Sequence, residues 1–180
     1  MNKDVIIETN RLRLRQWSLD DVSDLVDGLN NLNVSKWLAD VPYPYNEEDA
    51  LDFINYSLDN KAYNFAIVLK SENKVIGGVQ ISHISELHGT AKGGIWINEK
   101  YQGMGYGSEA FGARIEYAFN TLGLRRLENG YFKGNERSHK MQLRFGFKDE
   151  GIKRKAFISK ATGNIEDEYI TGLLKEEWIK

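Results

Sequence analysis

The 180-residue sequence predicts one mixed domain of helices and strands, of the α/β or α+β class. Two kinds of apolar pattern support this prediction. Some short runs either alternate apolar and polar residues with period two or are apolar throughout, as strands are, and other runs repeat apolar residues at helical spacing. The two kinds are interleaved along the chain, and no linker, repeat or low-complexity tract divides them. With 41% hydrophobic residues the chain can bury a core, so we expect residues 1–180 to form a single domain.

The first third of the chain is predicted to hold one strand and two helices. Arg11–Arg15 alternates arginine with leucine, which predicts a strand with one buried face. Two capping-box spacings follow, and apolar residues at helical spacing come after each of them. They are Ser18–Asp21 before residues 22–29 and Asn46–Asp49 before residues 51–58. The aromatic and proline-containing segment Trp37–Tyr45 lies between the helices and is predicted to be a loop.

The rest of the chain is predicted to alternate strands with two further helices. Tyr63–Leu69 and Val75–Ile84 flank a polar tetrapeptide, which predicts an antiparallel hairpin. Apolar residues at helical spacing then precede Gly123, a residue type that commonly ends a helix. The remaining predicted elements are a strand at Ala91–Asn98, a helix at Ser108–Leu122, a strand at Arg125–Tyr131, a short helix at Arg137–Phe145, and a final hairpin formed by Phe147–Ile158 and Glu166–Leu174.

Composition and charge exclude several classes of function. The net charge of −2 and the isoelectric point near 6.0 give no electrostatic reason to expect a nucleic-acid or membrane partner. Because the chain has no cysteine, it has no disulfide, thiolate metal site or cysteine nucleophile, and we expect no metal. No charged-then-apolar leader opens the sequence and no 18-residue apolar run occurs, so we expect a cytoplasmic protein.

The most informative motif is the glycine-rich segment Gln102–Gly107, which lies between a predicted strand and a predicted helix. Alternate glycines let the main chain approach a ligand closely, and the N–H groups at the start of a helix can bind a pyrophosphate. The spacing G-x-G-x-G matches neither the Rossmann fingerprint nor the P-loop. A tight turn without a ligand remains the alternative.

A second motif lies downstream, where Asn135 and Ser138 open a short helical segment that ends at Gly146–Phe147. Together the two motifs resemble the GCN5-related N-acetyltransferase (GNAT) superfamily, and more narrowly its ribosomal-protein N-acetyltransferase-like (RimJ/RimL-type) branch. The glycine-rich segment is similar to the Q/R-x-x-G-x-G/A loop of that superfamily. The resemblance extends to both ends of the chain, where Glu8–Leu14 looks like the opening strand and Leu173–Trp178 like the closing one.

This resemblance implies a central mixed, mostly antiparallel sheet, splayed at the cofactor site, with helices on both faces. It also implies an acetyl-CoA-dependent N-acetyltransferase. Main-chain groups of Trp96 and Ile97 would contact the pantetheine arm. The other residues that the resemblance implies in cofactor binding are Gln102, Gly103, Met104, Gly105, Tyr106, Gly107, Ser108, Asn135 and Ser138.

The catalytic residues depart from the usual pattern of the superfamily. Many relatives carry a tyrosine seven residues after the asparagine, where this chain has Gln142, so the resemblance implies Ser138 as the donor to the leaving thiolate. The alternative is that Ser138 only caps its helix. Lys92 stands where many members of the branch have a glutamate, which leaves Glu128 as the nearest candidate base. Glu128 could instead face solvent or pair with Arg126. His83 is a third candidate base.

The acceptor amine is expected to bind near Trp37, Tyr43, Tyr45 and Tyr131. The aromatic segment would otherwise pack in a homodimer interface. An α-amino group costs about 1 kcal/mol to neutralise at pH 7 and a lysine about 4.6 kcal/mol, so a site with a weak base suits a protein N-terminus. The alternatives are a small amine such as a polyamine, amino sugar or antibiotic, a CoA-binding module without turnover, or a nucleotide-binding regulator.

Overall fold

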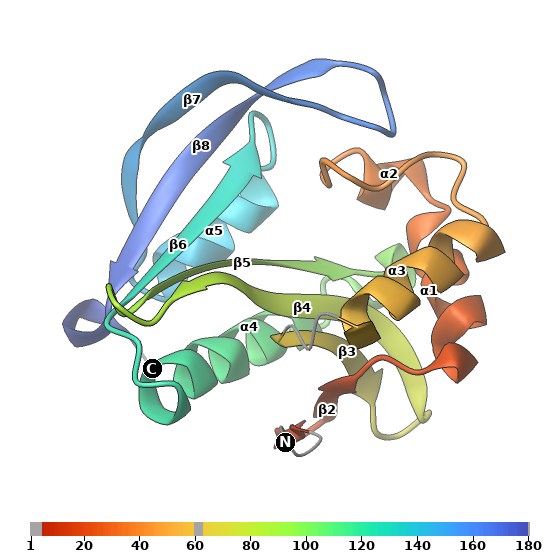
Figure 1. The fold of residues 1–180 in the computed structure, drawn as a ribbon, viewed down its shortest axis with the longest axis horizontal. Coiled ribbons are helices and arrows are strands. Elements are labelled where there is room, and N and C mark those ends of the chain that lie inside the picture. The colour runs from red at the N-terminus through yellow and green to blue at the C-terminus, as the bar shows by residue number, and fades with distance from the viewer. Residues whose placement is uncertain (1–4, 60–62, 180) are drawn as a thin grey trace.

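In the computed structural model, which describes residues 5–59 and 63–179, eight strands form one open sheet in the order β1-β2-β3-β4-β5-β6-β8-β7 (Figure 1). Every neighbouring pair is antiparallel except β5 and β6, which are parallel. The strands are β1 Ile7–Glu8, β2 Leu12–Gln16, β3 Tyr63–Leu69, β4 Lys74–Ser85, β5 Thr90–Ile97, β6 Arg126–Phe132, β7 Lys148–Ile158 and β8 Ile165–Leu174. The predicted mixed, mostly antiparallel sheet is confirmed.

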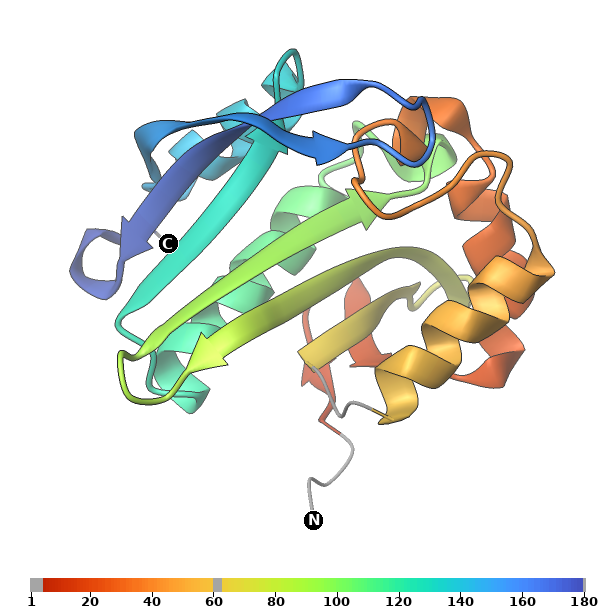
Figure 2. The same ribbon diagram turned by 45° about the horizontal axis from the view of Figure 1, so that its top comes forward.

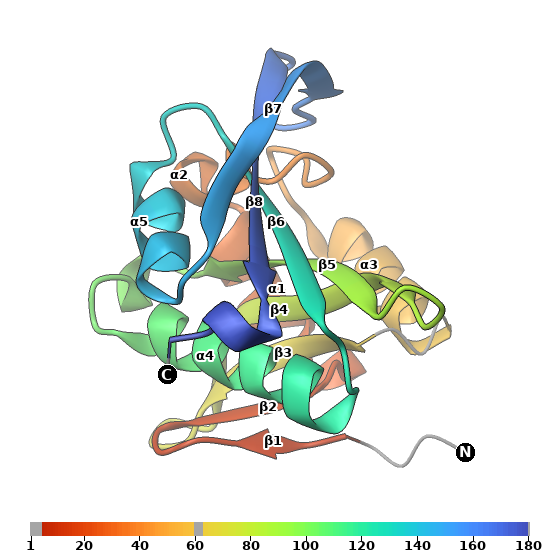
Figure 3. The same cartoon turned by 90° about the vertical axis from the view of Figure 1, so that its left-hand side faces the viewer.

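Helices cover both faces of this sheet, as predicted. The helices are α1 Val22–Leu29, α2 Leu32–Ser35, α3 Glu47–Asp59, α4 Tyr106–Glu116 and α5 Glu136–Arg144. Helices α1 and α3 pack with Ala66 and Val68 of β3 on one face, and α4 packs with Phe65 and Ile67 of the same strand on the other. Figure 3 shows α3 and α5 on opposite sides of the sheet. No helix within residues 5–59 and 63–179 has the length and apolar character needed to cross a bilayer.

The strands β5 and β6 pair over only part of their length. Their parallel register runs from Thr90 beside Arg126 to Gly93 beside Asn129, although β5 continues to Ile97 and β6 to Phe132. Figures 1 and 2 show the two strands side by side at one end and diverging toward the other. The sheet is therefore splayed beyond this last pair, and the unpaired main-chain edges of both strands face the gap.

A buried arginine lies under the point where the strands part. Arg114 of α4 is fully buried, and its Nη2 donates a hydrogen bond of 3.0 Å to Oδ1 of Asn129. A Cβ atom on Gly93 would lie 2.4 Å from the same Nη2, so only glycine fits there. Burial lowers the pKa of Arg114 to about 9, which leaves the guanidinium charged at neutral pH. A buried cation and a glycine therefore lie together at the last pair of the parallel ladder, Gly93 and Asn129.

Both ends of the chain differ from the sequence prediction. The segment Glu8–Leu14 is not one strand, because a turn interrupts it and Thr9 closes that turn by accepting a hydrogen bond from the Leu12 N–H. The two short strands on either side pair antiparallel. The closing segment Leu173–Trp178 leaves the sheet after β8, and Lys175–Glu177 forms a 3₁₀ turn instead.

The middle of the chain follows the prediction more closely. Both capping boxes form, at Ser18–Asp21 and Asn46–Asp49. Helix α2 was not predicted, and it begins where the side chain of Asn31 accepts from the N–H of Asn33. Helix α4 starts two residues earlier than expected and widens into a π-type turn at Tyr117–Thr121.

Candidate active site

The glycine-rich segment lies at the open end of the splayed strands and leads directly into α4. Gly103 and Gly105 have φ angles of 81° and 84°, a region that other residues rarely adopt. Gly105 is the N-cap of α4, and no side chain caps this helix. The first-turn amides, which have no partner within the helix, are therefore available to an anion. A Cβ on Gly103 would meet no atom within 4 Å, so the main chain is open to a ligand.

Arg11, from the turn before β2, holds this segment in place. Its Nη1 donates to the Met104 carbonyl at 3.0 Å, and its Nε donates to Glu109 at 2.7 Å. Its guanidinium also lies 4.4 Å from the ring centroid of Tyr106. The Met104 carbonyl oxygen therefore already accepts a hydrogen bond from within the protein. No local pattern predicts this contact, since the alternation at Arg11–Arg15 indicates only that Arg11 lies on the polar face of a strand.

Side chains on both edges of the gap also contact each other. Gln102 donates from Nε2 to the Ile97 carbonyl at 2.7 Å, and its Oε1 accepts from Arg137 of α5. Arg144, two turns further along α5, donates to Oγ of Ser108 at 3.3 Å. Two arginines of α5 thus contact this region, Arg137 at the glycine-rich segment and Arg144 at the first turn of α4. Their charges favour an anionic ligand at this end of the gap.

The strand geometry shows which main-chain groups at the end of β5 face the gap. The N–H of Asn98 donates to Ile76 of β4, so strand alternation points the main-chain groups of Trp96 toward β4 as well and those of Ile95 and Ile97 away from it. The Trp96 ring packs in the core beside α1. Ile95 therefore replaces Trp96 as the residue with main-chain groups beside the gap, together with Ile97.

Helix α5 forms the other wall, and Asn135 rather than Ser138 is its cap. Oδ1 of Asn135 accepts from the Ser138 N–H at 3.2 Å. The Ser138 hydroxyl is therefore free of the capping role considered as its alternative. Its Oγ instead accepts a hydrogen bond of 2.9 Å from Nε2 of the buried Gln142. Oε1 of Gln142 in turn accepts from the hydroxyl of Thr171 on β8, which lies beside Asn129 in the sheet.

Glu128 projects from the opposite face of β6, where it lies among cations. Its Oε1 accepts from Nζ of Lys92 at 2.8 Å, and Arg126 and Lys153 lie 4.0 Å away. The hydrogen bond to Glu128 raises the pKa of Lys92, so that ammonium stays protonated and cannot serve as a base. The pairing with Arg126 that the sequence offered as an alternative is therefore present, but the contact of Glu128 with Lys92 is shorter. The remaining candidate base, His83, is exposed at a β-bulge and contacts Ser82 at 3.2 Å.

The predicted acceptor residues do not form one surface. Trp37 lies near the turn after β6, since a Cβ on Gly134 would be 3.8 Å from its ring, and Tyr43 is exposed. Tyr45 is only 4% exposed and packs in the core, so it does not present its side chain to an acceptor. Tyr131 stacks on His139 of α5 at 4.8 Å between centroids, which places it on the face of β6 opposite Glu128.

The tip of the final hairpin lies beside the aromatic segment Trp37–Tyr45. The N–H of Lys160 in the turn between β7 and β8 donates to the Ala39 carbonyl at 3.0 Å. The aromatic segment, the turn after β6 and the hairpin tip are therefore neighbours. Of the predicted acceptor residues, Trp37 and Tyr43 belong to this group.

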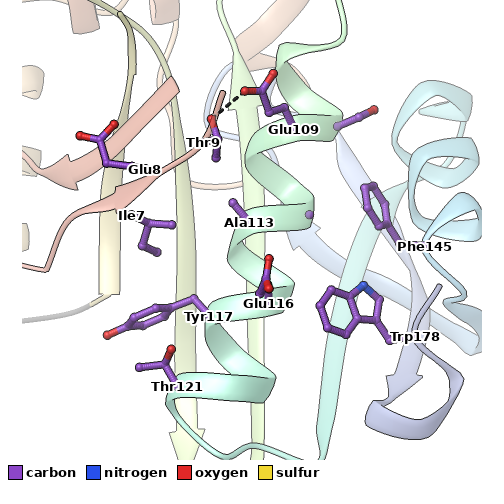
Figure 4. A pocket seen from close by; sticks show the side chains of 12 residues that line it. Ile7, Glu8, Thr9, Glu109, Ala113, Glu116, Tyr117, Thr121, Phe145 and Trp178 are labelled. Carbon is purple, nitrogen blue, oxygen red and sulfur yellow. Dashed lines mark hydrogen bonds between the residues drawn. The ribbon is translucent and has the colours of Figure 1, made fainter. Parts of the chain in front are cut away.

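A separate groove of about 580 Å³ runs along the outer face of α4 (Figure 4). It lies between β1 and the C-terminal segment, and it reaches the first turn of α4 at Ser108. Three carboxylates line it, from Glu8, Glu109 and Glu116. Figure 4 shows the Glu109 carboxylate bonded to Thr9, at 2.6 Å. Because carboxylates repel phosphates, this groove does not suit a pyrophosphate.

Comparison with known proteins agrees with this geometry. A family profile described as "Acetyltransferase (GNAT) domain" matches residues 11–148. Uncharacterized N-acetyltransferase p20 of Bacillus licheniformis is 32% identical over 173 residues, which cover 94% of this chain and 96% of that protein. The ribosomal-protein-serine acetyltransferase of Escherichia coli (strain K12) is 30% identical over 122 residues, covering 66% of this chain and 68% of its own.

Solved structures share the fold. The microcin C7 self immunity acetyltransferase MccE, solved in complex with acetyl-CoA and AMP, is 25% identical and superimposes with a TM-score of 0.78, covering 92% of this chain and 93% of its own. The profile match covers most of the chain, and the ribosomal-protein acetyltransferase among its relatives agrees with the branch that the motifs predicted. The chain therefore belongs to the GNAT family of N-acetyltransferases and is an acyltransferase.

Proposed function

We propose that residues 1–180 form one N-acetyltransferase domain that transfers the acetyl group of acetyl-CoA to the α-amine of a protein N-terminus. The observation that carries the proposal is the gap between β5 and β6, which opens beside uncapped α4 amides and two glycines with positive φ. A gap edged by strand main-chain groups that leads to the amides of a helix N-terminus fits an elongated ligand with an amide-bearing arm and a diphosphate. The acetyl-CoA complex of MccE, a protein of the same fold, supports that choice of ligand.

The residues have separate tasks in this proposal. The amides of Tyr106, Gly107 and Ser108 bind the diphosphate. Main-chain groups of Ile95 and the N–H of Ile97 bind the amide-bearing arm, since the Ile97 carbonyl accepts from Gln102. When acetyl-CoA is bound, its thioester would supply the acetyl group. Ser138 donates a hydrogen bond to the sulfur as negative charge develops there, an interaction that strengthens in the transition state.

Glu128 is the proposed base, acting from within its ion pair with Lys92. An ammonium group of the acceptor would compete with Lys92 for the carboxylate, which would bring the amine to the face of β6 where Glu128 lies. Lys92 therefore occupies one oxygen of this carboxylate. The α-amine fits such a site because neutralising it at pH 7 costs about 1 kcal/mol, against about 4.6 kcal/mol for a lysine side chain.

Two measurements test the function. Calorimetric titration with CoA measures binding, and thiol release detected with dithio-bis-nitrobenzoate measures turnover. We expect a peptide with a free N-terminus to accelerate thiol release, and the same peptide with a blocked N-terminus and an internal lysine to be at least tenfold slower. CoA binding without acceleration by any amine would show a binding module. Acceleration by a polyamine or amino sugar alone would refute the protein acceptor.

The donor assignment has its own test. Ser138→Ala is expected to lower kcat about tenfold, the effect of losing one hydrogen bond to a charged group, with little change in KM for acetyl-CoA. Steady-state kinetics of wild type and variant measure both constants. A variant that turns over at the wild-type rate would show that Ser138 is not the donor.

A further inference from the structure

The Ser138 hydroxyl is the outer end of a hydrogen-bonded chain that runs into the core. Gln142 is 1% exposed and Thr171 is fully buried, and they join Ser138 on α5 to β8. Buried polar side chains are costly unless their hydrogen bonds are satisfied, so the partners of these groups are constrained. The directions of the bonds therefore bear on what the serine proton can do.

An amide side chain can present either its oxygen or its nitrogen to each neighbour, which gives two arrangements. In the first, Thr171 donates to Oε1 of Gln142, and Nε2 donates to Ser138. The serine oxygen then accepts from inside and keeps its proton for a ligand. In the second, the amide is turned over. Ser138 then donates inward to Oε1, and its proton is not available to a ligand.

The surroundings of Thr171 decide between the two arrangements. If Nε2 of Gln142 donated to Thr171, the threonine proton would need another acceptor, and the carbonyl oxygen of Asn129 lies 3.5 Å from Oγ. That exceeds the range of about 2.5–3.0 Å expected for O–H···O bonds. Oε1 of Gln142, by contrast, accepts a hydrogen bond from the Thr171 hydroxyl. The threonine proton therefore belongs to Gln142, and the amide nitrogen faces Ser138.

We propose that Thr171 and Gln142 are positioning residues that fix the hydrogen-bond direction of Ser138, so that its hydroxyl donates outward to the sulfur of the bound thioester. This inference rests on the proposed function. It also restricts the chemistry of Ser138, because the group behind it is an amide N–H, which cannot replace a lost proton. Ser138 stabilises the leaving group without ionising.

The reaction then balances without a proton from the core. The nitrogen lone pair of the neutral amine forms the C–N bond, and the electron pair of the C–S bond leaves on sulfur. The nitrogen loses a proton to Glu128 or to water. The thiolate leaves with the hydrogen bond from Ser138 and takes its proton from solvent.

The experiment measures the ionisation of the CoA thiol bound to the protein, which requires no turnover. The ultraviolet absorbance of the thiolate is followed against pH in the complex, with bound S-methyl-CoA as the reference that cannot ionise. A donor at the sulfur favours the thiolate, so Ser138→Ala should raise the thiol pKa by about one unit, since a hydrogen bond to a charged group is lost.

The threonine variants then test the direction of the chain. Thr171→Val leaves Oε1 of Gln142 without its donor, so the amide can turn over and draw the serine proton inward. We expect the thiol pKa to rise by about half a unit or more, as fits partial loss of that bond. Thr171→Ser keeps the hydroxyl and should retain the wild-type value. In a Ser138→Ala background, Thr171→Val should have no further effect, because the group it orients is gone.

The outcomes separate this inference from the proposed function. Absence of CoA binding to the wild-type protein would refute the proposed function. If CoA binds and Ser138→Ala raises the thiol pKa, a lowered or unchanged pKa in Thr171→Val would overturn the inference alone. Gln142→Met provides a second variant should Thr171→Val fail to fold. It should also raise the pKa, whereas the opposite bond direction requires it to fall, because the serine would be released.

Discussion

Gly103→Ala tests whether the glycine-rich segment binds the diphosphate. Gly103 has a φ of 81°, and an added Cβ would meet no atom of the protein within 4 Å. The substitution therefore causes no clash within the fold. Its intrinsic cost is that of an L-residue in the left-handed region, about 1–2 kcal/mol. Any larger effect on ligand binding would have to come from a methyl group placed where the ligand lies.

Gly123→Ala is the matched control. Gly123 follows the π-type turn after α4, has a φ of 68°, and an added Cβ would also meet no atom within 4 Å. Both variants should lose about 1–2 kcal/mol of folding stability, which for a domain of this size lowers Tm by roughly 2–8 °C. Only Gly103→Ala should also lose affinity for CoA, by at least tenfold, because that segment alone adjoins the start of α4.

Thermal unfolding and calorimetric titration with CoA give the two quantities for each variant. The comparison is informative because the backbone cost is the same in both, so it cancels. Equal CoA affinity in the two variants, with equal falls in Tm, would refute the assignment of the diphosphate to this segment. The ligand would then have to bind elsewhere on the protein.

Three further predictions follow from contacts of the fold and site. Burial opposes ionisation of Glu109, but hydrogen bonds from Thr9 and the Arg11 main chain lower its pKa below the usual value. The carboxylate of Glu109 therefore stabilises the fold above pH 4.5, and this stabilisation is lost as the pH falls through the lowered pKa. Glu109→Gln should therefore lower Tm at pH 7, and its difference from wild type should disappear in a pH series below 4.5. Gly93→Ala should lower the free energy of unfolding by about 3 kcal/mol or prevent folding, since its Cβ would lie 2.2 Å from the Gln80 carbonyl. Gly94→Ala is the control, because the nearest atom to its Cβ would lie at 3.7 Å. A thermal unfolding assay should show that this control folds normally. If Glu128 is the base, Glu128→Gln should lower kcat/KM for an α-amine peptide about tenfold or more. Glu150→Gln is the control, because it removes the partner of Arg126 on the same face and should not lower kcat/KM. Equal effects of the two variants would show that only the ion-pair network matters.

Most of the fold could be predicted from the sequence because its signals are local. The alternation of Arg11–Arg15 matches β2, where Leu12 and Leu14 are fully buried, and both capping boxes form. The errors arise where short segments depend on tertiary contacts. The turn at Thr9 is tied to Glu109 of α4, a contact between residues 100 positions apart that no local pattern reveals.

The site was less predictable, for a similar reason. The glycines carry a backbone requirement that is visible in the sequence, and the resemblance implies Ser138 as the donor to the leaving thiolate, which stays a prediction. Tyr45 was read as a ligand-facing aromatic, but its burial follows from how α1 and α3 pack, which periodicity does not reveal. Arg114 was missed because a single arginine on a helix normally indicates an exposed face.

Lys92, which departs from the branch pattern, and Glu128 lie near the end of the parallel ladder. Lys92 lies beside Glu128 in the register, one pair before Gly93 and Asn129, and the ion pair between them crosses β5 and β6 on one face of the sheet. Arg114 contacts Asn129 from the other face. Polar contacts thus hold both faces at the point where the strands begin to part. A cross-strand pair of this kind contributes only about 0.2–1 kcal/mol, so its main consequence is geometric. Lysine in place of the usual glutamate thus adds an ion pair just before the gap begins, and under the proposed function proton removal is left to Glu128.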